Sequence, residues 1–384
     1  MPDPTLRAHS TTVGTVDDLH ESAIRATGLD DFGDDDYVEP LRILLDSYAH
    51  EAGLTAVGSK MFRYFLKGAL VARLLSEAGW RNHPESADVE IARPVFVTGL
   101  PRTGTTALHR LLSADPAHQG LEQWLAECPQ PRPPRDTWAT NPVYRGIADG
   151  LAQHRGANPE FMGLHYVAAD EVEECWQLLR QSLMSVSYES LAHIPAYSGW
   201  LAIQDCSGAY RRHRRNLQLI GLNDPGRRWV LKNPSHLFAL DALLETYPDA
   251  LIVQTHRAPE TIVASVCSLA DHATHGWSTT FTGDTIGTDQ LGLWSRGLRE
   301  FTQARARHDP AQFVDVDFAD LRADPIGTVE RIYDALGTEM SSAAREAVRS
   351  LDAESRTGDR QPRHTYRLAD YGLTEQRVRE AFAV

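Results

Sequence analysis

Apolar residues recur along this chain in two patterns, and each pattern predicts a different kind of element. Short runs rich in β-branched residues predict buried strands; they lie at 93–98, 228–232, 250–255 and 312–316. Apolar residues at helical spacing follow these runs, as at Leu108, Leu111 and Leu112 after the first. Strands that alternate with helices predict an α/β fold with a parallel sheet and helices on both faces.

The same patterns divide the chain into parts. Residues 1–36 are polar and acidic and predict a loose arm. Residues 37–91 carry two apolar stripes of helical spacing and predict an N-terminal helical extension. Residues 92–384 hold the α/β domain. Within this domain, about 140–222 predict a mainly helical insertion, whose clearest helix is expected at 170–179.

The turn after the first strand is rich in glycine and hydroxyl side chains. It reads Gly99-Leu-Pro-Arg-Thr-Gly104-Thr-Thr106 and joins a strand to a helix, as a phosphate-binding P-loop does. The nucleoside-triphosphate pattern G-x-x-x-x-G-K-[S/T] has lysine where this chain has Thr105. The turn therefore predicts a site for a phosphate-like anion but not for a triphosphate with Mg²⁺. The candidate ligands are Arg102, Thr103, Gly104, Thr105 and Thr106.

Two further cations follow predicted strands. Lys232 ends the run 228–232, and Arg257 comes directly after the run 250–255, with Ser265 about two helical turns further on. Ligands of parallel α/β sheets lie at the carboxyl ends of the strands. We therefore expect these side chains to surround the glycine-rich turn, with Arg257 and Ser265 binding a second phosphate.

Composition and charge narrow the possible functions. The net charge of −14 argues against general nucleic-acid binding, and no apolar run reaches the ~18 residues of a membrane span. The four cysteines have no C-x-x-C spacing, which argues against a zinc site and fits a reducing compartment. The first residues lack the pattern of an export signal. We therefore expect a cytoplasmic protein that binds a small anionic ligand.

These residues together resemble a known family. Pro101–Thr106 is similar to the 5′-phosphosulfate loop of sulfotransferases that use 3′-phosphoadenosine 5′-phosphosulfate (PAPS), and Arg257 with Ser265 is similar to their 3′-phosphate motif. Further matches are Leu231–His236, Tyr247–Ala250, Asp317–Leu321 and Ile332–Gly337. The likeness runs from about 92 to 340 and is greatest to the bacterial, tyrosylprotein-sulfotransferase-like branch. It implies a P-loop-kinase-like fold, PAPS as the donor, and no required metal.

The resemblance also implies roles for single residues. Arg102 and Lys232 would offset charge on the oxygen that leaves with the bisphosphate. The base for the acceptor hydroxyl would be a glutamate shortly after the P-loop helix, where Glu122 is the only carboxylate in Gly120–Trp124. Gln123 competes for this slot, and the rival bases are His118, His165 and Glu174. Arg363, in a basic C-terminal run, would close over the 3′-phosphate.

The acceptor is expected to be a small molecule with a hydroxyl group. Bulky apolar side chains in the insertion suit a lipid, alcohol or phenol better than a bare sugar; they include Phe161, Met162, Trp176, Tyr188, Tyr197 and Trp200. Two other functions stay open: a P-loop kinase or NTPase, which lacks its lysine here, and a non-catalytic bisphosphate-binding protein. A homodimer is an option, because the N-terminal helices could pack on a second subunit.

Overall fold

A parallel sheet forms the centre of the molecule. The computed structural model describes residues 12–157, 167–357 and 366–383. Its five strands pair in the order β2-β3-β1-β4-β5, and every pairing is parallel. They are β1 (Val95–Gly99), β2 (His118–Gln119), β3 (Arg228–Lys232), β4 (Leu251–His256) and β5 (Phe313–Asp317). The four predicted strands are confirmed; β2 is too short to leave a pattern in the sequence.

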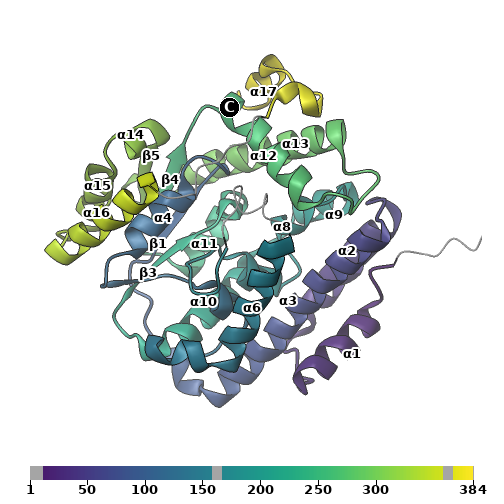
Figure 1. Ribbon diagram of the computed structural model, residues 1–384, viewed down its shortest axis with the longest axis horizontal. Helices are drawn as coiled ribbons and strands as arrows, with labels where there is room; N and C mark the ends of the chain where they lie inside the picture. Colours follow the sequence, from purple (N-terminus) through teal and green to yellow (C-terminus); the bar gives the residue numbers. More distant parts are fainter. Residues whose placement is uncertain (1–11, 158–166, 358–365, 384) are drawn as a thin grey trace, which may run out of the picture.

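Both faces of the sheet are covered by helices, as the α/β pattern predicts. Alternate residues of β1 point to opposite sides, so Phe96 belongs to one hydrophobic core while Val95 and Val97 belong to another. The smaller core is closed by α4 (Thr105–Ser113), α15 (Pro325–Leu336) and α16 (Ser342–Thr357), which lie together in Figure 1. The larger core is shared with the N-terminal helices and the insertion.

The remaining helices surround this frame. N-terminal to the sheet are α1 (Val16–Thr27), α2 (Val38–His50) and α3 (Ala56–Asn82). Between β2 and β4 lie α5 (Gln123–Glu127), α6 (Pro142–Ala157), α7 (Trp176–Arg180), α8 (Val186–Glu189), α9 (Pro195–Leu201), α10 (Ser207–Ile220) and α11 (Leu240–Thr246). Towards the C-terminus follow α12 (Pro259–Ala273), α13 (Gly283–Arg305), α14 (Phe318–Ala323) and α17 (Glu375–Ala381). Among the described residues, no helix combines the length and the apolar character needed to cross a bilayer.

The expectation of a loose arm is wrong for the described part of residues 1–36. Thr15 and Asp18 form a capping box that starts α1, and Leu19 and Ala23 on this helix are fully buried. The N-terminal helices lie together beside the insertion in Figure 1. A high acid content therefore does not mark a disordered segment here, because one face of α1 still carries the apolar residues that packing needs.

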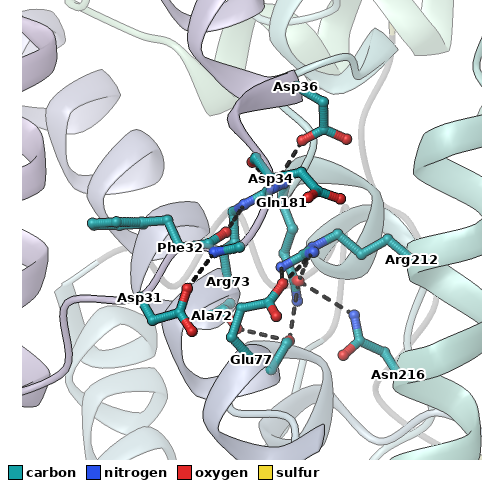
Figure 2. A network of polar contacts seen from close by, with 12 residues as sticks. Asp31, Phe32, Asp34, Asp36, Ala72, Arg73, Glu77, Gln181, Arg212 and Asn216 are labelled. Atoms are coloured by element: carbon teal, nitrogen blue, oxygen red, sulfur yellow. Dashed lines mark hydrogen bonds and ion pairs between the residues drawn. The ribbon is translucent and has the colours of Figure 1, made fainter. Parts of the chain in front are cut away.

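The acidic stretch after α1 is held by a buried arginine. Arg73 on α3 donates to the backbone oxygens of Phe32 and Asp34, both at 2.6 Å, and to Asp36 Oδ1 at 2.7 Å (Figure 2). It also donates to the backbone oxygen of Gln181 at 3.2 Å. One guanidinium thus joins the N-terminal segment to the end of α7, and these acceptors offset the cost of burying its charge.

The expected helix at 170–179 begins only at Trp176. The residues before it are extended: Val172 forms an antiparallel bridge with Glu122, and the Glu173 amide donates to the Leu121 oxygen at 2.8 Å. The Cys175 amide then donates to the Lys232 oxygen at 3.1 Å. Because the backbone donors find partners on neighbouring segments, this stretch has no need of helical hydrogen bonds. It runs across the carboxyl end of β3.

Candidate active site

The glycine-rich turn has a backbone that only certain residues tolerate. Gly99 has φ +142°, and a Cβ at this position would lie 2.6 Å from the Thr255 backbone oxygen. Gly104 has φ +94° and precedes α4 without any side-chain cap. The first N–H groups of α4 have no partners within the helix and lie at its positive dipole end. The turn is therefore suited to binding an anion.

The threonines of the turn are not equivalent. Thr103 Oγ1 donates to the Leu100 backbone oxygen and shares a hydrogen bond with Thr255 Oγ1, each at 2.6 Å. Its hydroxyl is thus bonded into the fold, which leaves its backbone N–H as the group that it can offer to a ligand. Thr105 is also buried, whereas Thr106 is half-buried and its Oγ1 accepts a hydrogen bond from Lys232 Nζ at 3.2 Å.

The two predicted anion motifs meet in the structure. Arg102 Nε donates to Ser265 Oγ on α12 at 3.2 Å, and Arg257 Nη1 donates to the Arg102 backbone oxygen at 3.2 Å. The Arg257 guanidinium lies 4.4 Å from the ring centroid of Phe318 on α14, which restricts its orientation. Burial lowers the pKa of Arg102, and the charge of Arg257 lowers it further. Two neighbouring cations that repel each other favour an anion that contacts both.

Lys232 is buried at the end of β3 and pairs with a carboxylate. Its Nζ donates to Glu174 Oε1 at 2.5 Å, and only 1% of the lysine side chain is exposed. Glu174 lies in the extended stretch before α7, so the same crossing that replaces the expected helix brings it to β3. Lys232, Glu174 and Thr106 therefore form one polar group beside the turn.

Glu122 lies in a different polar cluster. Its carboxylate accepts two hydrogen bonds from Arg132, at 3.1 and 3.0 Å. The other N–H groups of Arg132 donate to Gln119 Oε1, Asp224 Oδ2 and the Gly120 oxygen, each at 2.7 Å. All five donors of this guanidinium are thus satisfied. Glu122 is thus one of two carboxylates, with Asp224, that offset the cost of burying the charge of Arg132.

The histidine candidates do not join the site in the described part of the chain. His118 is buried in β2, where Nδ1 contacts the Leu112 backbone oxygen at 2.7 Å and the ring stacks on Tyr333. Burial lowers the pKa of His118. His165 and Arg363 lie outside the described residues, as do Phe161 and Met162.

Two features of this region carry little signal in the sequence. Thr255 is the last residue but one of β4 and holds Thr103 in place; its position at the end of a predicted strand is the one clue to this contact. Glu174 resembles a solvated helix residue as long as 170–179 are taken as helical. Only the backbone pairing with residues 121–122 and 232 turns its side chain inward.

Known proteins resemble this chain over most of its length. A model of the sulfotransferase family matches residues 94–342. The omega-hydroxy-beta-dihydromenaquinone-9 sulfotransferase Stf3 of Mycobacterium bovis is 27% identical over 265 residues, which cover 64% of this chain and 62% of that protein. The protein of the same name from Mycobacterium tuberculosis gives identical values. This chain thus matches less than two thirds of the length of these curated relatives.

Two solved structures extend the likeness to nearly the whole chain. Sulfotransferase STF1 from Mycobacterium tuberculosis H37Rv is 62% identical, with a TM-score of 0.91, and covers 97% of this chain and 99% of that one. Sulfotransferase STF9 from Mycobacterium avium is 28% identical, with a TM-score of 0.87, and covers 96% of this chain and 95% of that one. These similarities confirm the P-loop-kinase-like fold. The chain belongs to the sulfotransferase family.

Proposed function

We propose that this chain transfers a sulfuryl group from PAPS to the hydroxyl of a small, hydrophobic acceptor. One observation carries the proposal: a P-loop without its lysine lies between Lys232 at the end of β3 and Arg257 with Ser265 beyond β4. This arrangement offers separate positions for a 5′-phosphosulfate and a 3′-phosphate. PAPS would supply the sulfuryl group. The side chains around it would bind the donor, offset developing charge and accept the proton of the acceptor hydroxyl.

The donor would be held by groups that already lie together. The loop N–H groups of residues 103–106 and the Arg102 guanidinium would bind the 5′ end, while Arg257 and Ser265 would bind the 3′-phosphate. Arg102 Nε and Ser265 Oγ, now bonded to each other, would each gain a charged oxygen partner. Arg363 would add a further contact to the 3′-phosphate, as the sequence resemblance implies.

Lys232 and Glu174 have the chemistry that the transfer step requires. A buried ammonium at the loop would offset the negative charge that develops on the bridging oxygen as the sulfur–oxygen bond breaks. A carboxylate beside it would accept the proton of the acceptor hydroxyl. We favour Glu174 over Glu122 for this base, because Glu174 contacts Lys232 whereas Glu122 is bound to Arg132.

The acceptor is proposed from apolar side chains of the N-terminal helices and the insertion, and from one relative. Half-buried Phe65, Trp176 and Trp200 are apolar groups from α3, α7 and α9. Stf3 is named for its action on a dihydromenaquinone derivative, which is lipid-like. We therefore propose a lipid, alcohol or phenol. A cytoplasmic location is supported by all four cysteines being free thiols; a homodimer stays a proposal.

Calorimetric titration with adenosine 3′,5′-bisphosphate (PAP) tests the donor site, with ATP–Mg²⁺ as the competing ligand. We expect PAP to bind, ATP–Mg²⁺ not to compete, and Arg257→Ala to weaken PAP binding. A panel of hydroxyl acceptors with PAPS then tests transfer through the release of PAP. Preference for ATP–Mg²⁺ would indicate a kinase or NTPase, and PAP binding without turnover of any acceptor would indicate a non-catalytic binding protein.

A further inference from the structure

Arg180 differs from several other largely buried arginines in the described part of the chain. Four of those lie in direct contact with a carboxylate: Arg73 with Asp36, Arg132 with Glu122, Arg212 with Glu77 and Arg296 with Glu189, at 2.7 to 3.0 Å. For Arg180, no described residue places a carboxylate oxygen within the 4.0 Å of an ion pair. A guanidinium that is withdrawn from water without a counter-ion is costly for the fold.

The Arg180 guanidinium is nevertheless fixed in one orientation. Nε donates to Ser187 Oγ at 2.8 Å, and Nη1 donates to Gln177 Oε1 at 3.4 Å. The rings of Phe65 and Tyr188 lie 5.2 and 5.9 Å from its central carbon. These contacts use two of the five N–H donors and give Nη2 no partner among the described residues. A side chain held in this way loses little conformational entropy when it binds a ligand.

Arg180 lies beside Phe65, one of the apolar side chains proposed to contact the acceptor. It ends α7, the helix that begins two residues after Glu174, and the residue remains partly exposed to solvent. The carboxylates of Glu127 and Glu174 are near enough to favour its charged form, while burial lowers its pKa. Glu174 is already paired with Lys232, and Glu127 Oε1 accepts a hydrogen bond from Gln123. Neither carboxylate neutralises Arg180 by contact.

We propose that Arg180 binds an anionic oxygen group on the acceptor and so directs the acceptor hydroxyl towards Glu174 and Lys232. This inference rests on the proposed sulfotransferase function and narrows its acceptor to a hydroxy compound that also carries a carboxylate or a phosphate. The apolar part of such a molecule would lie against Phe65 and its neighbours. The free Nη2 donor would form a charge-assisted hydrogen bond to the anion, and Arg180 would then have a counter-ion, as Arg73, Arg132, Arg212 and Arg296 already do.

Matched probes test this inference in the full-length protein saturated with PAP. The ligands are ω-hydroxydecanoate and its amide, which differ in the charge of one end, and their binding is measured by calorimetry. We expect the wild type to bind the carboxylate about tenfold more tightly than the amide. Arg180→Gln should abolish this preference and Arg180→Lys should keep part of it. Arg211→Gln, at an exposed position on α10, serves as the matched control and should keep the full preference.

The ratio of the two affinities separates recognition from a purely structural role of Arg180. A variant that is only less stable would lose affinity for both probes alike, and its melting temperature would fall. Equal binding of the two probes by the wild type, binding of neither, or an unchanged preference in Arg180→Gln would overturn the proposal. PAP affinity is measured in every variant; if it is intact while the preference is absent, this inference fails and the proposed function does not.

Discussion

Lys232 Nζ and Glu174 Oε1 are 2.5 Å apart, although 58 residues separate them in the sequence. The lysine is fixed by the end of β3, and the glutamate is brought to it by an extended stretch whose amide at Cys175 donates to the Lys232 oxygen. Backbone and side chain of Lys232 thus both bind the same neighbouring segment. This pair, rather than Glu122, is adjacent to the glycine-rich turn.

Glu174→Gln should lower kcat by about 10²- to 10⁴-fold while PAP affinity changes little, because the proposed general base is removed and the proposed donor ligands stay. Lys232→Met should lower kcat as well, since the ammonium no longer offsets charge on the leaving oxygen. Steady-state rates with PAPS and calorimetry with PAP measure the two effects. Full activity of Glu174→Gln would assign the base to another residue.

Glu122→Gln should affect stability and leave the chemistry intact. The substitution replaces one of the two carboxylates that contact buried Arg132, so the free energy of unfolding should fall by about 1.5–3 kcal/mol, the range for hydrogen bonds to charged groups. Urea unfolding measures this loss, and kcat is determined at a temperature where the variant is folded. A large fall in kcat with unchanged stability would return Glu122 to the role of base.

Arg257→Ala should weaken PAP binding by about 10- to 100-fold, because a charge-assisted contact to phosphate is worth roughly 1.5–3 kcal/mol. Ser265→Ala removes a neutral donor and should have a smaller effect. Titration of each variant with PAP and with adenosine 5′-monophosphate locates the loss, since the monophosphate lacks the 3′ group. If both ligands were weakened equally by Arg257→Ala, this residue would not bind the 3′-phosphate.

Arg73→Met should destabilise the protein by about 3 kcal/mol or more, because the acceptors on residues 32, 34, 36 and 181 lose their shared donor (Figure 2). Limited proteolysis should then cut first near the acidic stretch 30–36. Arg81→Met, which removes a half-exposed ion pair with Asp31, is the matched control and should cost less than about 1 kcal/mol. Equal losses in the two variants would contradict the anchoring role of Arg73.

Stability should fall as the pH is lowered from about 6.5, because burial depresses the pKa of His109 and of His213 to about 3. Between about pH 3 and pH 6.5 the unfolded chain binds protons that the folded protein does not. Each histidine therefore lowers the free energy of unfolding by about 1.4 kcal/mol for every unit by which the pH falls. Above about pH 6.5 these histidines are neutral in the unfolded chain as well, so they no longer make stability depend on pH. Urea unfolding between pH 7 and pH 5 measures the slope. His109→Gln should flatten it, and exposed His275→Gln should not.

The sequence by itself determined the parts of the molecule that depend on local pattern. Strand runs, the glycine-rich turn and the cations that follow strands could all be predicted, because parallel strands bring their carboxyl ends to one edge. Arg102, Arg257 and Ser265 therefore come together as expected. The motifs that resemble those of the sulfotransferase family are likewise short stretches of sequence, and they could be recognised without the tertiary structure.

Tertiary structure decided whatever depends on distant partners. The stretch before Trp176 has helical composition but is extended, because residues 121 and 232 accept its backbone hydrogen bonds. The acidic segment after α1 is ordered because Arg73 binds its carbonyl oxygens. Glu122 and Glu174 look alike in the sequence, and only the cations that each one contacts separate a structural carboxylate from a candidate base. Contacts of this kind leave no periodic signal, since they join residues that no spacing rule relates.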